Sequence, residues 1–381
     1  MNARDVLSFN FGRVPLAVRS LLRDWIRLVI SIGGIGFAIL LVLLLDGIRE
    51  GTVAKSTTYV DNVGADVFVA RQGVTNMALA ASAIPEELVG EVAAVDGVQE
   101  ATGILRIPVI VAVGDVKRPV TLIGYDTAAG LGGPWKLDGG RTVQTAGEAV
   151  VDNALAGELG LDEGDTIEIL STDFTVVGRS AETANIAGKH VFIVREALAT
   201  TLGLTGRVSF ILVRVEPGRD AGAVARAINE LVPEVTATTR DDLSENDREL
   251  LSSLFVAPVN VMSTVGFLVG LAIVGLTMYT TTAERLRDFG VLKAIGAPNW
   301  FLFRTVMTQG IVLAFAGFLV GLGASLLTGP VLVSFVPDVG VKIEAASAIR
   351  TLGAVLGMSV LGAVLPVARI VRVDPLMVFR G

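Results

Sequence analysis

The stretch TTAERLRDFGVLKAIGAPNW, residues 281–300, lies between two long apolar segments and decides how the chain is interpreted. Apolar residues recur in it every three positions, at Leu286, Phe289, Leu292 and Ile295. This spacing indicates an amphipathic helix, and Gly296-Ala297-Pro298 is a typical helix stop. The charged residues fall largely elsewhere, at Glu284, Arg285, Arg287, Asp288 and Lys293. The stretch therefore predicts a helix along a membrane surface that offers its charges to a partner, although a passive surface helix has the same spacing.

Four apolar runs are long enough to cross a bilayer core of about 30 Å, which takes roughly 20 helical residues. They are residues 28–45, 258–279, 305–333 and 352–368. None contains Asp, Glu, Lys or His, the side chains that carry the coupling charge in proton- and ion-driven transporters. We therefore expect four membrane spans and no ion-coupled transport by this chain alone.

The charge of the chain is unevenly distributed. Residues 46–257 contain 17 lysines and arginines against 31 aspartates and glutamates, a net charge of −14, whereas the whole chain carries −7. An acidic domain of this kind argues against nucleic acid as a partner. The remaining segments are basic and flank the apolar runs, which suggests that they lie on the cytoplasmic side. We predict that both termini and residues 283–300 are cytoplasmic, and that the first run is an uncleaved anchor.

Residues from about 50 to 250 are numerous enough to bury a core of their own, and their pattern predicts a mixed α+β domain. Strands and helices interleave without a strict βαβ repeat. Hairpins are expected around Gly114-Asp115 and Thr172-Asp173, and a helix from Pro85 to Val95. Further helices are expected from Ala154 to Leu159, ending at Gly160, and from Asp220 to Leu231. Residues 240–249 predict a helical stalk leading into the second apolar run.

Motifs of several enzyme classes are absent from the sequence. There is no GxxxxGK[ST] loop for ATP, no HExxH zinc motif and no GxSxG elbow. The chain has no cysteine, which excludes thiolate catalysis and disulfides. Its single histidine, His190, opens a predicted apolar strand and is interpreted as a structural or surface residue. No catalytic residue, metal site or cofactor site is predicted.

Glycines spaced by four residues lie in three of the apolar runs. Such spacing allows close helix–helix packing, either within one chain or between two copies. The pairs are Gly266 with Gly270, Gly317 with Gly321, and Gly353 with Gly357.

Four stretches, in order, resemble the MacB/FtsX-type ABC transporter permease family. ERLRDFGVLKAIGA is similar to the loop after the second span of these proteins. LAVRSLLRDWIRLVISIGGI (16–35) is similar to their basic first helix and first span, and GIREGTVAKSTTYVDNVGADVFVARQG (47–73) to the start of their outer domain. PVARIVRVDPLMVFR (366–380) is similar to their C-terminal motif. The family usually has Glu where this chain has Asp288.

The resemblance implies a membrane protein of four transmembrane α-helices, with a large α+β extracytoplasmic domain inserted between the first and second. Its segments would be a basic cytoplasmic helix (1–27), transmembrane helix 1 (28–48), the extracytoplasmic domain (49–250), and a stalk with transmembrane helix 2 (251–282). They continue with a coupling helix (283–300), transmembrane helix 3 (301–333), a short outer loop (334–350), transmembrane helix 4 (351–368) and a cytoplasmic tail (369–381).

The resemblance also implies partners and roles. The chain would act as a dimer, with an identical or paralogous permease, on two separate cytoplasmic ATPase subunits that bind ATP and Mg. The coupling residues carried over by position are Glu284, Arg285, Arg287, Asp288, Phe289, Gly290 and Lys293. A membrane-fusion adaptor protein and membrane lipids are further partners of such a complex.

Two functions are compatible with this reading. The first is the permease subunit of a complex that exports or extracts a lipid, lipoprotein, peptide or drug through ATP-driven movement of the outer domain. The second is an FtsX-like regulatory subunit that transmits the ATPase state to an extracytoplasmic partner such as a cell-wall hydrolase. The outer domain, with about 200 residues, is closer in size to the first.

Overall fold

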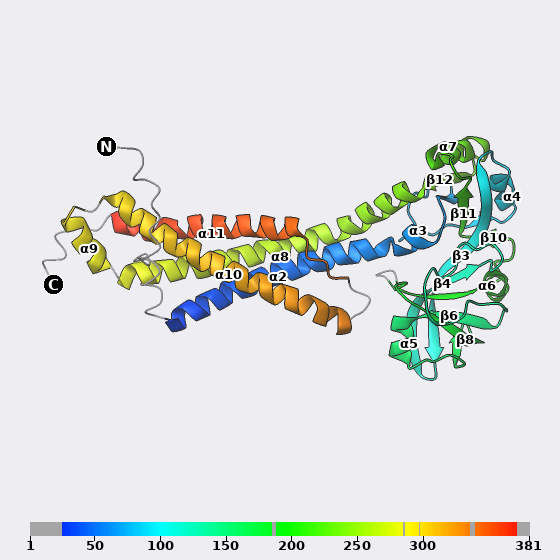
Figure 1. The fold of residues 1–381 in the computed structure, drawn as a ribbon, viewed down its shortest axis with the longest axis horizontal. Helices are drawn as coiled ribbons and strands as arrows, with labels where there is room; N and C mark the ends of the chain where they lie inside the picture. The colour runs from blue at the N-terminus through cyan, green and yellow to red at the C-terminus, as the bar shows by residue number, and fades with distance from the viewer. Residues whose placement is uncertain (1–24, 185–187, 285, 297, 336–339, 372–381) are drawn as a thin grey trace. The chain divides into compact units, whose positions relative to one another are not determined.

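The computed structural model describes residues 25–184, 188–284, 286–296, 298–335 and 340–371 (Figure 1). These residues form two compact units, each described here by itself. The helical unit comprises the described residues of Met1–Gly47, Ala257–Leu332 and Lys342–Gly381. The sheet unit comprises those of Ile48–Val256 and Val333–Val341. The C-terminal motif beyond residue 371 lies outside the described residues.

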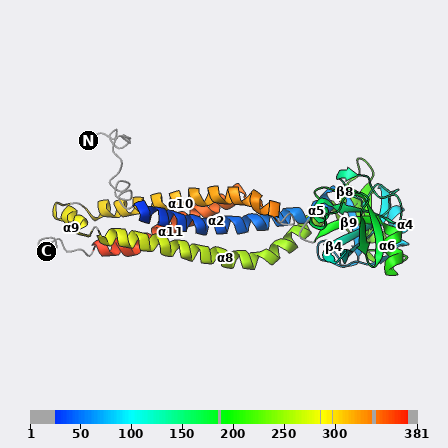
Figure 2. The same ribbon diagram turned by 90° about the horizontal axis from the view of Figure 1, so that it is seen from below.

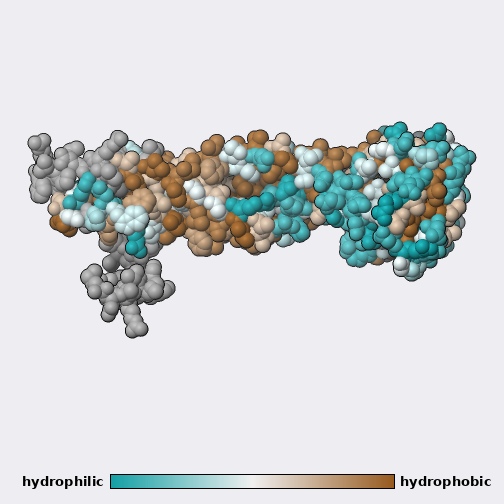
Figure 3. All heavy atoms as spheres, turned by 90° about the horizontal axis from the view of Figure 1, so that it is seen from above, coloured by the Kyte–Doolittle hydropathy of each residue, from teal (hydrophilic) through white to brown (hydrophobic). Residues whose placement is uncertain are grey.

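Among the residues that the structure describes, four helices are long and apolar enough to cross a membrane. They are α2 (Trp25–Ser56), α8 (Arg240–Glu284), α10 (Asn299–Phe335) and α11 (Ala345–Val371). They run alongside one another in the helical unit (Figure 2), and hydrophobic side chains cover much of its visible surface (Figure 3). The short helix α9 (Leu286–Ala294) connects α8 to α10. The number of apolar helices agrees with the expectation from the sequence.

Helix α8 unites what the sequence suggested as two elements. Its 45 residues, Arg240–Glu284, contain both the expected stalk and the second apolar run without a break. Asp241 and Asp242 lie in its first turn, where carboxylates interact favourably with the positive end of the helix dipole. Pro258 lies inside the helix and can donate no backbone hydrogen bond there. The stalk and the span are therefore parts of one helix.

The sheet unit contains twelve strands and five short helices within the described residues. The helices are α3 (Thr58–Asn62), α4 (Leu88–Ala93), α5 (Asn153–Leu159), α6 (Arg195–Leu202) and α7 (Ala221–Leu231). The strands are β1 (Val67–Arg71), β2 (Ile84–Pro85), β3 (Val98–Val113), β4 (Val116–Tyr125), β5 (Leu137–Gly140), β6 (Glu148–Asp152), β7 (Thr166–Ile169), β8 (Thr172–Ser180), β9 (Lys189–Val194), β10 (Arg207–Val208), β11 (Phe210–Val215) and β12 (Val235–Thr239).

Strand β3 joins the two halves of the main sheet. Over the described residues that sheet has ten strands in the order β12-β1-β11-β3-β4-β9-β6-β8-β5, with β7 paired to β3 and β8. The 16 residues of β3 allow its first half to pair with β11 and its second half with β4. Most pairs are antiparallel, but β4–β9 and β6–β8 are parallel. The prediction of a mixed α+β domain is confirmed.

Three hydrophobic clusters form the interior of the sheet unit. One lies between α4, α7 and the β1/β11 half of the sheet, around Val92 and Ile228. A second lies between α5, α6 and the β4/β9 half, around Leu155 and Leu198. The third includes Phe68, Phe192 and Phe210 and combines residues from both halves. Figure 1 shows α4 and α7 near one half of the sheet, and α5 and α6 near the other. Each half is therefore covered by its own pair of helices.

Local signals in the sequence placed several elements correctly. Helix α5 ends at Gly160, which has φ 64°, a left-handed conformation that residues with a Cβ adopt at a cost. The hairpin at Gly114-Asp115 joins β3 to β4 as expected. Helix α7 begins after Asp220, whose carboxylate accepts hydrogen bonds from the backbone amides of Gly222 and Ala223 at 3.3 and 3.0 Å.

Two expectations were wrong. Pro85 belongs to strand β2, which pairs with β10, and the following helix α4 begins only at Leu88. The second hairpin turns at Leu170-Ser171, so Thr172 and Asp173 lie in β8. Leu170 and Ser171 have φ 51° and 63°. Positive φ at both central residues is typical of a type I′ turn, whose twist matches that of the flanking strands. The register of the two strands therefore fixed the position of the turn, although the residues at the turn do not favour it.

Replacing Ser171 by glycine is therefore expected to stabilise the chain. A side chain in the left-handed region costs roughly 1–2 kcal/mol, and glycine removes most of this cost while losing more backbone entropy on folding. We expect a net gain of roughly 0.5–1 kcal/mol in the free energy of unfolding, measured by thermal unfolding of the full chain in detergent. Ser171→Ala, which keeps the Cβ, is the matched control and should give no gain.

Candidate functional site: the helical unit, its connecting helix and a membrane-level cavity

Close contact between α2 and α10 organises the helical unit. A Cβ built on Gly317 would lie 2.5 Å from Cγ2 of Ile35, and one on Gly321 would lie 2.6 Å from the carbonyl oxygen of Gly36. Both distances are shorter than real Cβ contacts, so only glycine allows the two backbones to approach this closely. The pair Gly317/Gly321 thus lies at a helix–helix contact within the chain.

The other two glycine pairs differ from each other. A Cβ on Gly266 would meet Val42 of α2 at 2.8 Å, and one on Gly270 would meet the sulfur of Met358 in α11 at 3.0 Å. These two glycines therefore place α8 against both α2 and α11. A Cβ on Gly353 or Gly357 would meet nothing within 4 Å. The described chain gives this third pair no packing partner, so its expected role in packing stays a prediction for contact with a second copy.

Helix α9 is anchored at its centre and exposed around it. Phe289 is 7% exposed and belongs to the core cluster of the helical unit, with Met278 of α8 and Leu302 of α10. Gly290 is buried as well, whereas Arg287 is exposed, as is Glu284 at the end of α8. A buried aromatic side chain fixes the position of a short helix relative to its neighbours, because moving it would open a cavity in the core.

The remaining residues expected for coupling lie as follows. Lys293 is partly exposed and lies in the last turn of α9. Arg285 and the side chain of Asp288 lie outside the described residues. Ile295, the last residue of the expected apolar stripe, is 76% exposed. Among the members of the stripe whose side chains the structure describes, Phe289 is the buried one, and Arg287 on the same helix is exposed.

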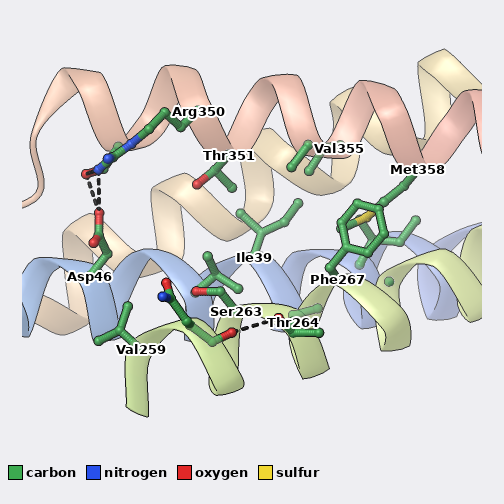
Figure 4. Close-up of a pocket in the computed structure, with 18 residues that line it drawn as sticks. Ile39, Asp46, Val259, Ser263, Thr264, Phe267, Arg350, Thr351, Val355 and Met358 are labelled. Atoms are coloured by element: carbon green, nitrogen blue, oxygen red, sulfur yellow. Dashed lines mark hydrogen bonds and ion pairs between the residues drawn. The ribbon is translucent and has the colours of Figure 1, made fainter. Parts of the chain in front are cut away.

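A cavity of about 450 Å³ lies among α2, α8 and α11 in the helical unit (Figure 4). Asp46 and Arg350 lie at one end of it, and Phe267 and Met358 at the other. Apolar side chains of α2 and α11, among them Ile39 and Val355, line the space between. Helix α8 contributes polar groups to the same wall, at Asn260, Ser263 and Thr264. The cavity therefore changes from charged and polar to apolar along its length.

This cavity was not predicted from the sequence, although one signal for it was present. Asn260, Ser263 and Thr264 are spaced by three and four residues, so they lie on one face of an otherwise apolar helix. Asp46 follows the first apolar run, and Ser347 lies before the fourth. Their proximity could not be expected, because 301 positions separate them in the sequence.

His190 is a packing residue of the sheet unit. It is 1% exposed, stacks on Tyr59 at a ring distance of 5.9 Å, and its Nδ1 lies at hydrogen-bond distance from the carbonyl oxygen of Thr183. Burial lowers the pKa of His190 to about 4, so the ring is neutral at pH 7 and Nδ1 donates to that carbonyl. In the described part of the chain no group of three or more His, Cys, Asp and Glu residues could hold a metal ion.

Comparison with known proteins identifies the family. Residues 28–231 match the family model described as MacB-like periplasmic core domain, and residues 260–375 match that described as FtsX-like permease C-terminal. The first match spans more than half of the chain. The chain therefore belongs to the MacB/FtsX-type ABC transporter permease family, and the resemblance stated from the sequence is confirmed. It is a membrane-spanning protein with an extracytoplasmic domain.

Relatives by sequence carry consistent names. The chain is 28% identical over 356 residues to an uncharacterised ABC transporter permease of Mycobacterium tuberculosis, covering 93% of this chain and 96% of the relative. It is 22% identical over 242 residues to the macrolide export ATP-binding/permease protein MacB of Neisseria gonorrhoeae, covering 60% of this chain and 37% of that protein.

A solved structure is also similar to part of the chain. The periplasmic region of MacB from Actinobacillus actinomycetemcomitans aligns over 50% of this chain and 95% of its own length, with a TM-score of 0.39 and 13% sequence identity.

Proposed function

We propose that this chain is the permease subunit of an ABC transporter, and that it couples ATP hydrolysis by a separate cytoplasmic ATPase to movement of its extracytoplasmic domain. The observation that carries the proposal is α9, in which Phe289 is buried in the core of the helical unit while Arg287 is exposed. A force applied to the exposed charges of α9 would thus be transmitted through Phe289 to α8 and α10.

Continuity of the helices supports the second half of the coupling. Helix α8 continues without interruption from Glu284, beside α9, back to Arg240, which follows β12 directly. Near that end the Asp247 carboxylate accepts hydrogen bonds from the backbone amides of Met77 and Ala78, at 2.9 and 3.0 Å. Arg248 forms an ion pair with Asp61 at 3.0 Å. The first turns of α8 therefore belong to the sheet unit and are held within it by directional bonds, and we infer that movement of α8 acts on that unit through them.

The proposed topology follows the basic flanks. Arg287 and Lys293 precede α10, and an acidic sheet unit follows α2, so we assign α9 and both termini to the cytoplasm and the sheet unit to the outer face. The ATPase would bind ATP and Mg, and two permease copies would act together. Export is favoured over a regulatory role, because a relative is named for macrolide export and the match to the MacB-like domain covers most of the sheet unit.

Arg287→Glu is expected to abolish co-purification of the ATPase. Reversing an exposed charge at a complementary interface replaces attraction by repulsion, and a change of about 1.4 kcal/mol is already tenfold in affinity. The chain should be purified from native membranes in mild detergent, and the ATPase recovered with it should be quantified. We expect a loss of roughly tenfold or more, with membrane insertion of the chain unchanged.

Arg304→Glu is the matched control, because Arg304 is an exposed arginine on the same proposed side of the membrane but belongs to α10. It should retain the ATPase. Equal recovery from the Arg287 and Arg304 variants would contradict the assignment of α9 as the coupling helix. Absence of any ATPase from the unmodified chain would contradict the proposed function, and a co-purifying cell-wall hydrolase would favour the regulatory alternative.

A further inference from the structure

The cavity among α2, α8 and α11 has a charged end in which both charges are held in place. The Asp46 carboxylate accepts hydrogen bonds from the Ser347 hydroxyl and from Nη2 of Arg350, the latter at 3.2 Å. Nη2 of Arg350 also lies 3.0 Å from Oγ of Ser347. The Asp46 side chain is 15% exposed and that of Arg350 is 66% exposed, so the arginine faces the opening. Asp46 and Arg350 are the charged residues of the lining, one negative and one positive, so the lining has no net charge.

The wall in the middle of the cavity contains polar side chains. Thr264 donates its hydroxyl hydrogen to the backbone carbonyl of Asn260 at 2.8 Å, so it is satisfied within α8. Ser263 and Thr351 are further polar members of the lining. Side chains of this kind tolerate both a polar linker and an alkyl chain, because their own hydrogen bonds can be made to the helix that carries them.

The far end of the cavity is apolar. Phe267 and Met358 close it, with Ile39 and Val355 along the sides (Figure 4). A cavity of about 450 Å³ lies within the range of roughly 300–1,000 Å³ found for small-molecule sites, so it has room for one ligand of about the size of a single-chain amphiphile.

We propose that this cavity binds an amphiphile with a single alkyl chain and a polar head group without net charge, the head group lying at Asp46 and Arg350 and the chain reaching Phe267 and Met358. A zwitterion is the best complement, since each of its charges meets the opposite one. A net anion would be attracted by Arg350 but repelled by Asp46, and a cation would meet the reverse.

The orientation of the cavity agrees with this occupant. The proposal names the substrate class of the proposed permease and in that respect rests on the proposed function. In the topology given above, Asp46 follows the first apolar run and Arg350 precedes the fourth, so the charged end lies at the outer boundary of the membrane. An amphiphile in the outer leaflet has its head group at that boundary and its chain directed inward, as the cavity requires.

Photo-crosslinking of the full chain tests the proposal. The chain, reconstituted in nanodiscs of diacyl phosphatidylcholine, is incubated with lysophosphatidylcholine that carries a diazirine at the end of its chain, and the crosslinked residues are mapped by mass spectrometry. We expect crosslinks concentrated at Phe267 and Met358. Ala354→Phe, which fills the cavity from its lining, should reduce them at least fivefold. Leu327→Phe on α10 is the control, because Leu327 is 76% exposed and outside the lining, and it should leave them unchanged.

Competition defines the head group. Unlabelled lysophosphatidylcholine should compete with the probe more strongly than the anionic lysophosphatidylglycerol. Asp46→Asn should reverse this order, because Arg350 would then be the remaining charge at the opening. An unchanged order in this variant would overturn the assignment of the head group. Labelling by the single-chain probe should persist although the surrounding nanodisc consists of diacyl phosphatidylcholine. Complete absence of labelling in these nanodiscs would overturn the single-chain assignment.

The outcomes are independent of the ATPase. Crosslinks spread over the whole outer surface of the helical unit, or unchanged in Ala354→Phe, would indicate annular lipid only and overturn the proposal. That result would leave the coupling role of α9 intact if the Arg287 variant still loses the ATPase. Localised crosslinks in a chain that recovers no ATPase would instead retain the binding site and remove the transporter function.

Discussion

Replacing Gly321 by leucine is expected to separate α2 from α10 and to abolish most of the stably folded helical unit. A Cβ at this position would lie 2.6 Å from the carbonyl oxygen of Gly36 and 2.7 Å from Cβ of Ile39. Neither atom can move without moving the backbone of α2. Overpacking of a core usually costs 1–3 kcal/mol, and we expect a loss at the upper end, roughly 3 kcal/mol, because a backbone atom is the obstacle.

Gly323→Leu provides the matched control on the same helix. Gly323 is two residues away, and a Cβ there would meet nothing within 4 Å. Both variants have the same composition and the same change in helix propensity, so their difference isolates the contact with α2. The measurement is thermal unfolding of the full chain in detergent, together with the fraction recovered as a monodisperse species. Equal behaviour of the two variants would show that α2 and α10 do not pack through Gly321.

Acidification is expected to destabilise the sheet unit through His190. Its ordinary pKa is 6.5, and burial lowers the pKa in the folded chain to about 4. Between these two pH values the unfolded chain binds a proton that the folded chain rejects, so the free energy of unfolding falls as the pH drops from 6.5 to 4. The lowered pKa corresponds to roughly 3 kcal/mol in the free energy of unfolding. This contribution is fully present above pH 6.5 and is lost as the pH falls to 4.

The contribution of His190 is measured as a difference between two chains. Carboxylates also titrate in acid, but they do so equally in the unmodified chain and in His190→Gln, which cannot titrate at this position. The difference in free energy of unfolding between the two should shrink by roughly 3 kcal/mol from pH 7 to pH 4. Trp135 is a suitable reporter, because its ring lies 6.0 Å from that of Tyr59, on which His190 stacks. Replacing Trp25 and Trp300 by phenylalanine in both chains would make its fluorescence specific, and parallel pH profiles would contradict the assignment.

Much of the fold could be predicted because its signals are local. A run of about 20 apolar residues must be helical in a membrane, where no water satisfies the backbone, so four runs predicted four long helices. Asp220 before α7 and Gly160 after α5 are signals of the same kind, since a helix cap depends on one or two residues. The stretch around Phe289 likewise indicated a short helix between two spans, and α9 has that position.

The errors occurred where non-local pairing competed with local preference. The turn at Leu170-Ser171 contains no glycine, asparagine or aspartate, and it is imposed by the register of β7 against β8. Pro85 suggested a helix start but pairs as a strand with Arg207, 122 positions later. Such pairings depend on partners far along the chain, and residue preference at the turn carries little information about them.

The sequence by itself determined the apolar spans, the acidic α+β unit between the first two, the absence of the usual nucleotide and hydrolase motifs, and the family. All of these depend on composition or on motifs of short range. Only the tertiary structure decided that Phe289 is buried and Arg287 exposed, because burial depends on neighbouring helices. It alone brought Asp46 to Ser347 and Arg350 at the end of a cavity, since the 304 positions between Asp46 and Arg350 are bridged by the packing of α2 against the rest of the helical unit.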